Sequence, residues 1–247
     1  MTTPNEAVLT VLIYSSLAAA LAALGVAPFS RREPVPLRWI GWAYALASGL
    51  MLGAGYILMT EGLARATLPV MLGAGLGVGY TYWTQAYSGT KELETRPGND
   101  PGPDRGIQFV LQSAMHSASE GIAIGVAMAV NLRLGVFVAL ALAVHNIAEA
   151  MVLTDVLRKR KMSLGDAAGM CIITNVPQVL LAIAAFAVAP AIPGFLPWAL
   201  GFAAGALVYL VMTELLPASY ERGRSTGIAF LVSVSTGGVV LLKGFFV

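Results

Sequence analysis

The sequence predicts an all-α membrane protein with eight transmembrane helices, from its composition, its apolar segments and the segregation of its basic residues. Of the 247 residues, 57% are hydrophobic and only 11% are charged, whereas about 25% are charged in a typical soluble domain. The mean hydropathy is +0.76. So few charges cannot cover a surface that faces water, and the expected solvent is therefore membrane lipid.

Eight apolar segments are each long enough to cross a hydrocarbon core of about 30 Å, which takes about 20 helical residues. The stretch before the first segment has no lysine or arginine, so the run is interpreted as a helix rather than a signal peptide. The segments are expected to form a single transmembrane domain over residues 1–247. The expected helices lie at roughly 7–27, 39–62, 66–87, 108–130, 134–155, 166–189, 195–217 and 225–246, separated by turn-rich stretches such as 28–36 and 96–106.

The basic residues lie almost entirely on one side of the expected membrane. If eight helices alternate in direction, 12 of the 15 lysines and arginines fall in the loops of one side, and only Arg65, Arg133 and Lys243 fall on the other. Because cytoplasmic loops are enriched in Lys and Arg, both termini are expected outside the cytoplasm. The expected location is a bacterial inner membrane. The net charge of +2, spread over short loops, argues against nucleic acid as a partner.

A short internal repeat links the second and seventh expected helices. Residues 56–63 read YILMTEGL and residues 209–216 read YLVMTELL. The two helices would run in opposite directions, so the copies would be inverted. Inverted repeats are common in secondary transporters.

Both histidines of the chain fall inside expected helices, and each is followed four residues later by a glutamate. The fourth helix contains His116 and Glu120, and the fifth contains His145 and Glu149. Residues at i and i+4 share one face of a helix. An ionisable side chain at mid-bilayer costs at least about 2.5 kcal/mol on insertion scales, so each of these four groups needs a reason to be there.

The depths of the two motifs predict one convergent site. His116 lies about 12 Å and His145 about 17 Å from the respective ends of their helices, at a rise of 1.5 Å per residue. The connection near Asn131 is short, so the two helices are expected to be antiparallel neighbours. Imidazole and carboxylate groups at similar depth can then bind one divalent first-row metal ion, such as zinc.

Three other interpretations of the motifs stay open at this point. The histidines and glutamates could pair only with each other, or they could form a proton relay. Two histidines on neighbouring helices could also ligate a b-type haem in an electron-transfer subunit, although the two glutamates would then have no purpose. An intramembrane metalloenzyme is disfavoured, because the chain has no H-E-x-x-H motif and no further ligand at that depth. We therefore expect that this protein is not an enzyme.

Other polar residues are less informative. In the sixth helix Pro177 should kink the backbone, and Asn175 either supplies an oxygen ligand or caps a carbonyl that the proline leaves free. Glu61 and Glu214 lie near helix ends. Their side chains could reach water there, which would explain the two charges, or they could act as gate or entry residues. The glycines at 73, 75, 77 and 79 are expected to form one close-packing surface.

With these motifs in place, the sequence resembles the ZIP family of zinc/iron-regulated transporters over nearly its whole length. The family pattern is close to H-N-x-x-E-G on helix 4 and H/Q-N/D-x-P-E-G on helix 5. Here helix 4 has His116, Ser117 and Glu120 before a glycine, and helix 5 has His145 and Asn146, with Glu149 before an alanine. The resemblance implies a ZIP-like bundle with inverted repeats.

The resemblance also implies a ligand set and a mechanism. His116, Glu120, His145 and Glu149 would hold the transported ion, most simply Zn²⁺, with Fe²⁺, Mn²⁺ or Cd²⁺ as further candidates. A second site would use Ser117 and Asn146 together with a glutamate before the helix 6 proline. Val176 stands at that last position and Ser117 replaces the usual asparagine, so the second site is expected to be weak or absent. The resemblance further implies transport by alternating access and a homodimer in membrane lipid. Because imidazole must be neutral and carboxylate ionised to bind a metal, uptake is expected to fall at acid pH.

Overall fold

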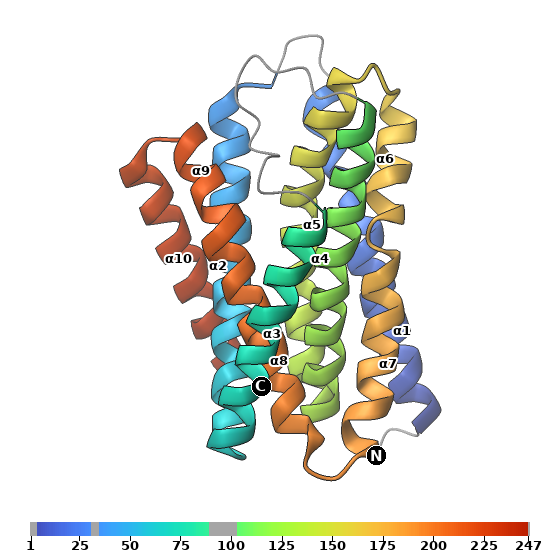
Figure 1. The fold of residues 1–247 in the computed structure, drawn as a ribbon, viewed down its shortest axis with the longest axis vertical. Helices are drawn as coiled ribbons and strands as arrows, with labels where there is room; N and C mark the ends of the chain where they lie inside the picture. The colour runs from blue at the N-terminus through green and yellow to red at the C-terminus, as the bar shows by residue number, and fades with distance from the viewer. Residues whose placement is uncertain (1–3, 31–34, 89–102, 247) are drawn as a thin grey trace.

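A computed structural model describes residues 4–30, 35–88 and 103–246, and helices are the only regular secondary structure in these ranges. The helices run side by side in an elongated bundle (Figure 1). Most of the turn-rich stretch predicted at 96–106 lies outside the described residues. The predicted all-α architecture is confirmed.

The helices follow the predicted segments closely, and three segments contain a change of helix type or a break. In chain order the elements are α1 (Pro4–Leu21), the 3₁₀-helix η1 (Ala22–Ser30), α2 (Leu37–Leu63), α3 (Thr67–Ser88), α4 (Pro103–Val130), α5 (Leu132–Lys159), α6 (Leu164–Ile173), α7 (Val176–Ala191), α8 (Phe195–Leu210), the π-helical turn η3 (Val211–Leu215), α9 (Leu216–Arg222) and α10 (Ser225–Phe246).

Six helical segments within the described ranges are long and apolar enough to cross a membrane. They cover residues 5–30, 37–63, 132–159, 164–191, 195–222 and 225–245. Two further predicted spans correspond to α3 and α4, of 22 and 28 residues, which lie alongside the other helices (Figure 1). The protein is therefore a helical membrane protein, and the count of eight spans and the inverted repeat stay predictions.

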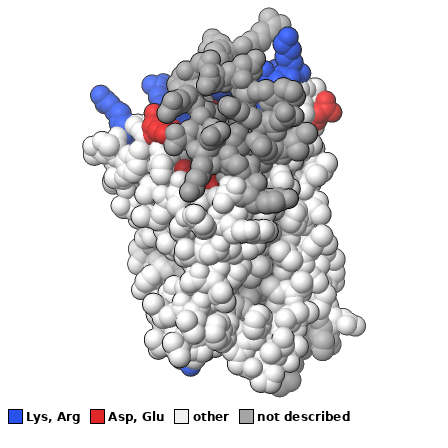
Figure 2. Space-filling view, viewed as in Figure 1, with Lys and Arg blue, Asp and Glu red and all other residues white. Residues whose placement is uncertain are grey.

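The surface has the polarity expected of a bilayer-embedded bundle. In Figure 2, lysine and arginine side chains gather at the upper end of the molecule, while the broad band below them on this face carries neither. On α10, Phe230, Leu241 and Phe245 are each at least 70% exposed. Such a surface would drive aggregation in water, and lipid covers it at no cost.

Glycines let α3 and α8 pack with their backbones close together. A Cβ atom at Gly73 would collide with the carbonyl oxygen of Trp198, and one at Gly77 would collide with that of Phe202. Residues 73 and 77 are one turn apart and therefore face the same neighbour. Lipid tails are as apolar as leucine, so this kind of close packing holds membrane helices together.

The other two glycines of the predicted packing surface have no such role. A Cβ atom at Gly75 or Gly79 would meet nothing within 4 Å. Alternate residues point to opposite sides of a helix, so a spacing of two cannot make one surface. The prediction was right for Gly73 and Gly77 and wrong for Gly75 and Gly79.

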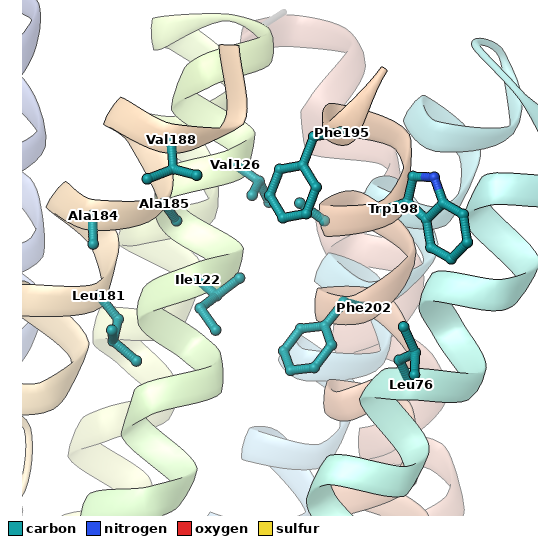
Figure 3. Close-up of a pocket in the computed structure, with 11 residues that line it drawn as sticks. Leu76, Ile122, Val126, Leu181, Ala184, Ala185, Val188, Phe195, Trp198 and Phe202 are labelled. Atoms are coloured by element: carbon teal, nitrogen blue, oxygen red, sulfur yellow. The ribbon is translucent and has the colours of Figure 1, made fainter. Parts of the chain in front are cut away.

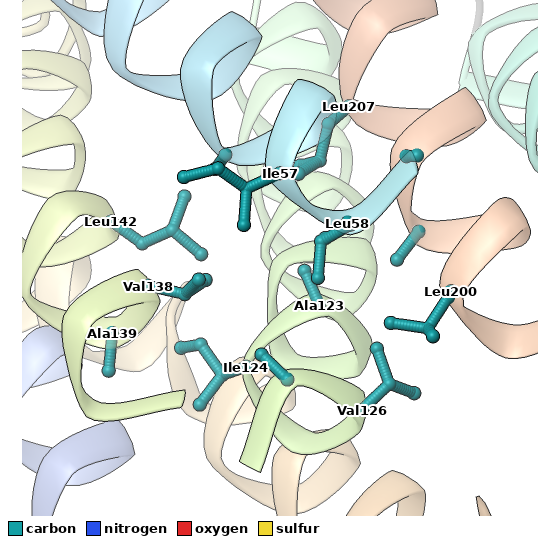
Figure 4. Close-up of a cluster of buried hydrophobic side chains, with 14 of the residues drawn as sticks. Ile57, Leu58, Ala123, Ile124, Val126, Val138, Ala139, Leu142, Leu200 and Leu207 are labelled. Carbon is teal, nitrogen blue, oxygen red and sulfur yellow. The ribbon is translucent and has the colours of Figure 1, made fainter. Parts of the chain in front are cut away.

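The main hydrophobic core lies where α2, α4, α5 and α8 meet (Figure 4). Ile57 and Leu58 of α2, Ile124 of α4, Leu142 of α5 and Leu207 of α8 are buried there with at most 1% of their surface exposed. These residues fill the centre of the bundle without a polar group. Along α4 and α5, this core lies between the two His/Glu motifs and the α4–α5 connection.

Two helices change course where a proline removes a backbone donor. Pro177 cannot bond back to the carbonyl of Ile173, and α6 ends at Ile173 while α7 begins at Val176. The predicted kink is thus a break. In the same way Pro217 cannot bond back to Thr213, which lies in the π-helical turn η3. Such turns often occur at functional sites.

The α3–α8 contact predicts opposite effects of one substitution at two neighbouring glycines. Gly77→Ala and Gly79→Ala both gain about 1 kcal/mol of helix propensity. Only the first introduces a backbone collision, which costs about 1–3 kcal/mol. In thermal unfolding in detergent, Gly77→Ala should have the lower Tm of the two by several degrees. Equal melting temperatures would contradict the contact.

Candidate metal site

The site is built on α4 and α5, which are antiparallel and joined by one residue, Asn131. Its side-chain Oδ1 accepts a hydrogen bond from the N–H of Arg133 at 2.8 Å and caps the start of α5. At the far end of the pair, the hydroxyl of Ser113 on α4 donates to Oε1 of Glu149 on α5 at 2.9 Å. The predicted antiparallel neighbours are confirmed.

Three ionisable side chains from this helix pair converge. Nε2 of His145 lies 3.0 Å from Oε1 of Glu120 and 3.7 Å from Oε2 of Glu149. One ligand atom from each of the three side chains lies within 4.8 Å of the others. In a tetrahedral zinc site, ligand atoms about 2.0 Å from the metal are about 3.3 Å apart. The three groups are therefore arranged as metal ligands would be.

The carboxylates of this cluster lack the partners that buried anions need. Both oxygens of Glu120 and Oε2 of Glu149 are buried and accept no hydrogen bond within the described residues. The side chain of Glu120 is fully buried. A buried charge without a partner is costly, and His145 alone faces two carboxylates. A divalent cation is the partner that balances two carboxylates.

His116 faces a different carboxylate. Its Nε2 lies 3.4 Å from Oε2 of Glu214, on the π-helical turn η3. Oε1 of Glu214 also accepts a hydrogen bond from Nε2 of Gln85 on α3 at 2.6 Å. The structure thus places His116 one helical turn away from the Glu120, His145 and Glu149 cluster, in contact with η3 and linked to α3 through Glu214.

Sequence reasoning did not assign Glu214 and Gln85 to the site. The position of Glu214 near a helix end left a gate role open beside simple exposure to water, and nothing in the sequence singles out Gln85. The one available hint was Pro217, which disturbs the helix next to Glu214. The spacing of polar residues along a regular helix could not predict a π-helical turn.

Asn146, a predicted ligand, links three helices through its amide nitrogen, while its buried Oδ1, the atom that could ligate a metal, accepts no hydrogen bond within the described residues. Its Nδ2 donates to the carbonyl of Ala18 on α1 at 3.1 Å and to Oε1 of Gln178 on α7 at 2.8 Å. Asn146 and Gln178 are both fully buried. This bridge fixes α5, and with it His145, relative to α1 and α7.

Two more predicted ligands lie at the break between α6 and α7, Ser117 of α4 beside it and Asn175 within it. The hydroxyl of Ser117 donates to the carbonyl of Thr174 at 2.7 Å, a group on the break itself. Nδ2 of Asn175 donates to the carbonyl of Cys171 at 2.9 Å, while its buried Oδ1 accepts no hydrogen bond within the described residues. The amide of Asn175 therefore both caps a carbonyl and presents an oxygen.

Glu61 lies far from this site and has local partners. Nζ of Lys243 on α10 lies 2.8 Å from its Oε1, and Arg65 lies 3.2 Å from its Oε2. These contacts tie the end of α2 to the end of α10. They give Glu61 a structural role that needs no metal.

The fold and the site define a class: a helical membrane protein with a buried imidazole–carboxylate cluster between two of its helices. A model of the ZIP zinc transporter family matches residues 88–243, a range that contains all the residues of the cluster. This chain belongs to the ZIP family. The resemblance expected from the paired motifs is confirmed.

A curated relative extends the similarity beyond that range. A protein of Arabidopsis thaliana with the name "Putative zinc transporter" is 31% identical over 242 residues, which make up 96% of this chain and 39% of the relative. The chain thus spans well under half the length of that protein.

The bridge at Asn146 predicts a measurable loss of stability. Gln178→Leu removes the acceptor from a buried amide, and such bonds between membrane helices contribute about 1 kcal/mol. This corresponds to a decrease in Tm of about 2–4 °C. Ser15→Ala is the control, because the buried hydroxyl of Ser15 bonds only within its own helix, to Val11 and Leu12. An unchanged Tm for Gln178→Leu would show that the bridge is not formed.

Proposed function

We propose that this protein transports a divalent metal ion, most simply Zn²⁺, into the cytoplasm, and that it binds the ion between α4 and α5. The observation that supports this most directly is the buried cluster of Glu120, His145 and Glu149. Its carboxylates have no other charge partner that neutralises both, and a divalent ion matches their total charge. Family membership supports the same conclusion.

The cluster suits an ion that must leave again. Structural zinc sites are closed by four protein ligands, whereas sites with three protein ligands keep a position open for exchange. Here Glu120, His145 and Glu149 supply three donors. We propose one well-made site, because Ser117 and Val176 stand where the family's second site has an asparagine and a glutamate. The other predicted ligands, His116, Asn146, Ser117 and Asn175, are proposed to lie outside the first coordination shell of the ion at this position.

The membrane arrangement is part of the proposal. All eight predicted segments, including α3 and α4, would span the bilayer, and both termini would lie outside the cytoplasm. The gathering of lysine and arginine at one end of the bundle supports that orientation. The repeated motif at 56–63 and 209–216 would then relate two inverted halves of a single transmembrane domain in a bacterial inner membrane.

The burial of the site supports access from the cytoplasmic side. The exposed fraction of the side chain is 0% for Glu120, 16% for Glu149 and 23% for Glu214, so exposure rises toward the end that carries most basic residues. On the other side lies the apolar core with Ile124 and Leu142. Alternating access would require this core to open toward the outside.

His116 and Glu214 form a second pair of ligands on the proposed transport route. They lie one turn of α4 closer to the cytoplasmic end than Glu120, and they offer the same ligand types. An ion released by the cluster would meet them next. This assignment gives Glu214 the role of an exit ligand.

The sequence and the site leave the choice of metal broad. Imidazole and carboxylate ligands also accept Fe²⁺, Mn²⁺ and Cd²⁺. The haem alternative is not favoured, because each imidazole faces a carboxylate and the family match is to transporters. A Soret band in the purified protein would reverse that conclusion.

Transport should depend on the cluster and not on exposed acidic residues away from the proposed route. In proteoliposomes, Glu120→Gln and His145→Ala should each reduce ⁶⁵Zn uptake to the level of empty vesicles, because each removes a ligand or a compensating charge. Glu221→Gln is the control, since the side chain of Glu221 is 53% exposed and pairs with the neighbouring Arg222. Wild-type uptake by both cluster variants would place the route elsewhere.

The hydroxyl of Ser113 should tune the site through Glu149. Ser113→Ala removes the bond that orients this carboxylate, and loss of such an outer partner typically costs 10–100-fold in metal affinity. Ser119→Ala is the matched control, because the equally buried Ser119 donates to a carbonyl of its own helix. Zinc titration of the two purified variants measures the difference. Equal affinities would mean that Ser113 has no part in binding.

A further inference from the structure

A cleft of about 350 Å³ lies away from the metal site, between the α4–α7 pair and the α3–α8 pair (Figure 3). This volume is within the range of about 300–1,000 Å³ that small-molecule sites occupy. Its lining is almost wholly apolar and comes from all four helices, as Leu76, Ile122, Leu181 and Phe202 illustrate. None of the residues that line it is ionisable.

The cleft is closed toward the core and open toward the lipid-facing surface. Val126 and Ala199 form its inner side and are 0% and 6% exposed. Leu76, Val188 and Phe195 lie at its mouth and are 61%, 43% and 38% exposed. The mouth is therefore continuous with the apolar surface that faces the membrane.

The lining also has a defined depth along the bundle. On α7 it covers Leu181 to Val188, close to the last residue, Ala191, and on α8 it begins at the first residue, Phe195. The cleft thus lies in the half of the bundle that ends at the α7–α8 connection. In the proposed orientation this is the outer leaflet.

These observations restrict the occupant. Water does not fill a cavity whose walls offer no hydrogen-bond partners, and an empty cleft loses dispersion contacts on every wall. A polar or charged ligand would be left unpaired. Only hydrocarbon matches the lining, and at this depth the surrounding membrane supplies hydrocarbon as the acyl chains of its lipids.

We propose that this cleft binds one acyl chain of an outer-leaflet phospholipid. The chain enters between α3 and α7, and its headgroup stays at the membrane surface, outside the cleft. The bound chain fills the seam between the two helix pairs. The proposal concerns lipid binding alone and does not depend on which ion the protein transports.

Photolabelling tests this in nanodiscs that contain phosphatidylglycerol with a diazirine in one acyl chain. Mass spectrometry of the labelled peptides should find the label enriched at least several-fold on residues 181–188 and 195–202, relative to the lipid-facing side of α10. Ala184→Phe fills the mouth of the cleft and should reduce that enrichment several-fold. Ala184 is itself exposed, so the substitution leaves the packed interior intact.

Ala187→Phe is the matched control, because Ala187 is an exposed alanine of the same helix that does not line the cleft. It should leave the labelling unchanged. Ala184→Leu, a smaller filling, should give an intermediate decrease. Uniform labelling of all lipid-facing helices, or equal labelling of the Ala184→Phe and Ala187→Phe proteins, would overturn the proposal. Efficient disulfide-linked dimers of a Phe195→Cys chain would also overturn it, by placing a second copy at the mouth.

Discussion

The burial of Glu120 is the constraint on which the rest of the structure depends. A carboxylate with no exposed surface, whose oxygens accept no hydrogen bond from the part of the chain that the structure describes, is one of the most costly groups that a membrane helix can carry. His145 compensates one charge at most, and Glu149 adds another. One imidazole cannot balance both carboxylates, and this imbalance is the basis of the proposal that the cluster binds a cation.

Hydrogen bonds around the cluster hold its residues in place despite the cost of burying the two carboxylates. Asn146 bonds to α1 and α7, Ser113 holds Glu149, and Ser117 bonds to the break between α6 and α7. The two helix irregularities lie beside the cluster: the break between α6 and α7 exposes the carbonyl of Thr174, and the π-helical turn η3 carries Glu214. Proline causes the first and lies next to the second, so the polar environment of the site follows from the positions of Pro177 and Pro217.

The sequence predicted the helical segments and the approach of Glu120, His145 and Glu149, because both follow largely from local rules. That these three residues ligate a metal stays a prediction. Hydrophobic length defines a span, and the spacing of four puts His145 and Glu149 on one face. It failed where the outcome depends on a partner helix. His116 faces Glu214, which lies on the π-helical turn of another helix. The error at Gly75 and Gly79 has a different cause, because residues two apart lie on opposite sides of one helix. Gln178 drew no attention, because its role exists only once α5 and α7 are in contact.

The central claim is that one divalent ion binds between α4 and α5 with a single imidazole among its ligands. X-ray absorption spectroscopy of the purified protein loaded with one equivalent of zinc tests this directly. The account predicts a first shell of nitrogen and oxygen atoms at about 2.0–2.1 Å, with outer-shell scattering from one histidine that disappears in His145→Ala and persists in His116→Ala. Scattering from two histidines, or a spectrum that His145→Ala leaves unchanged, would contradict it.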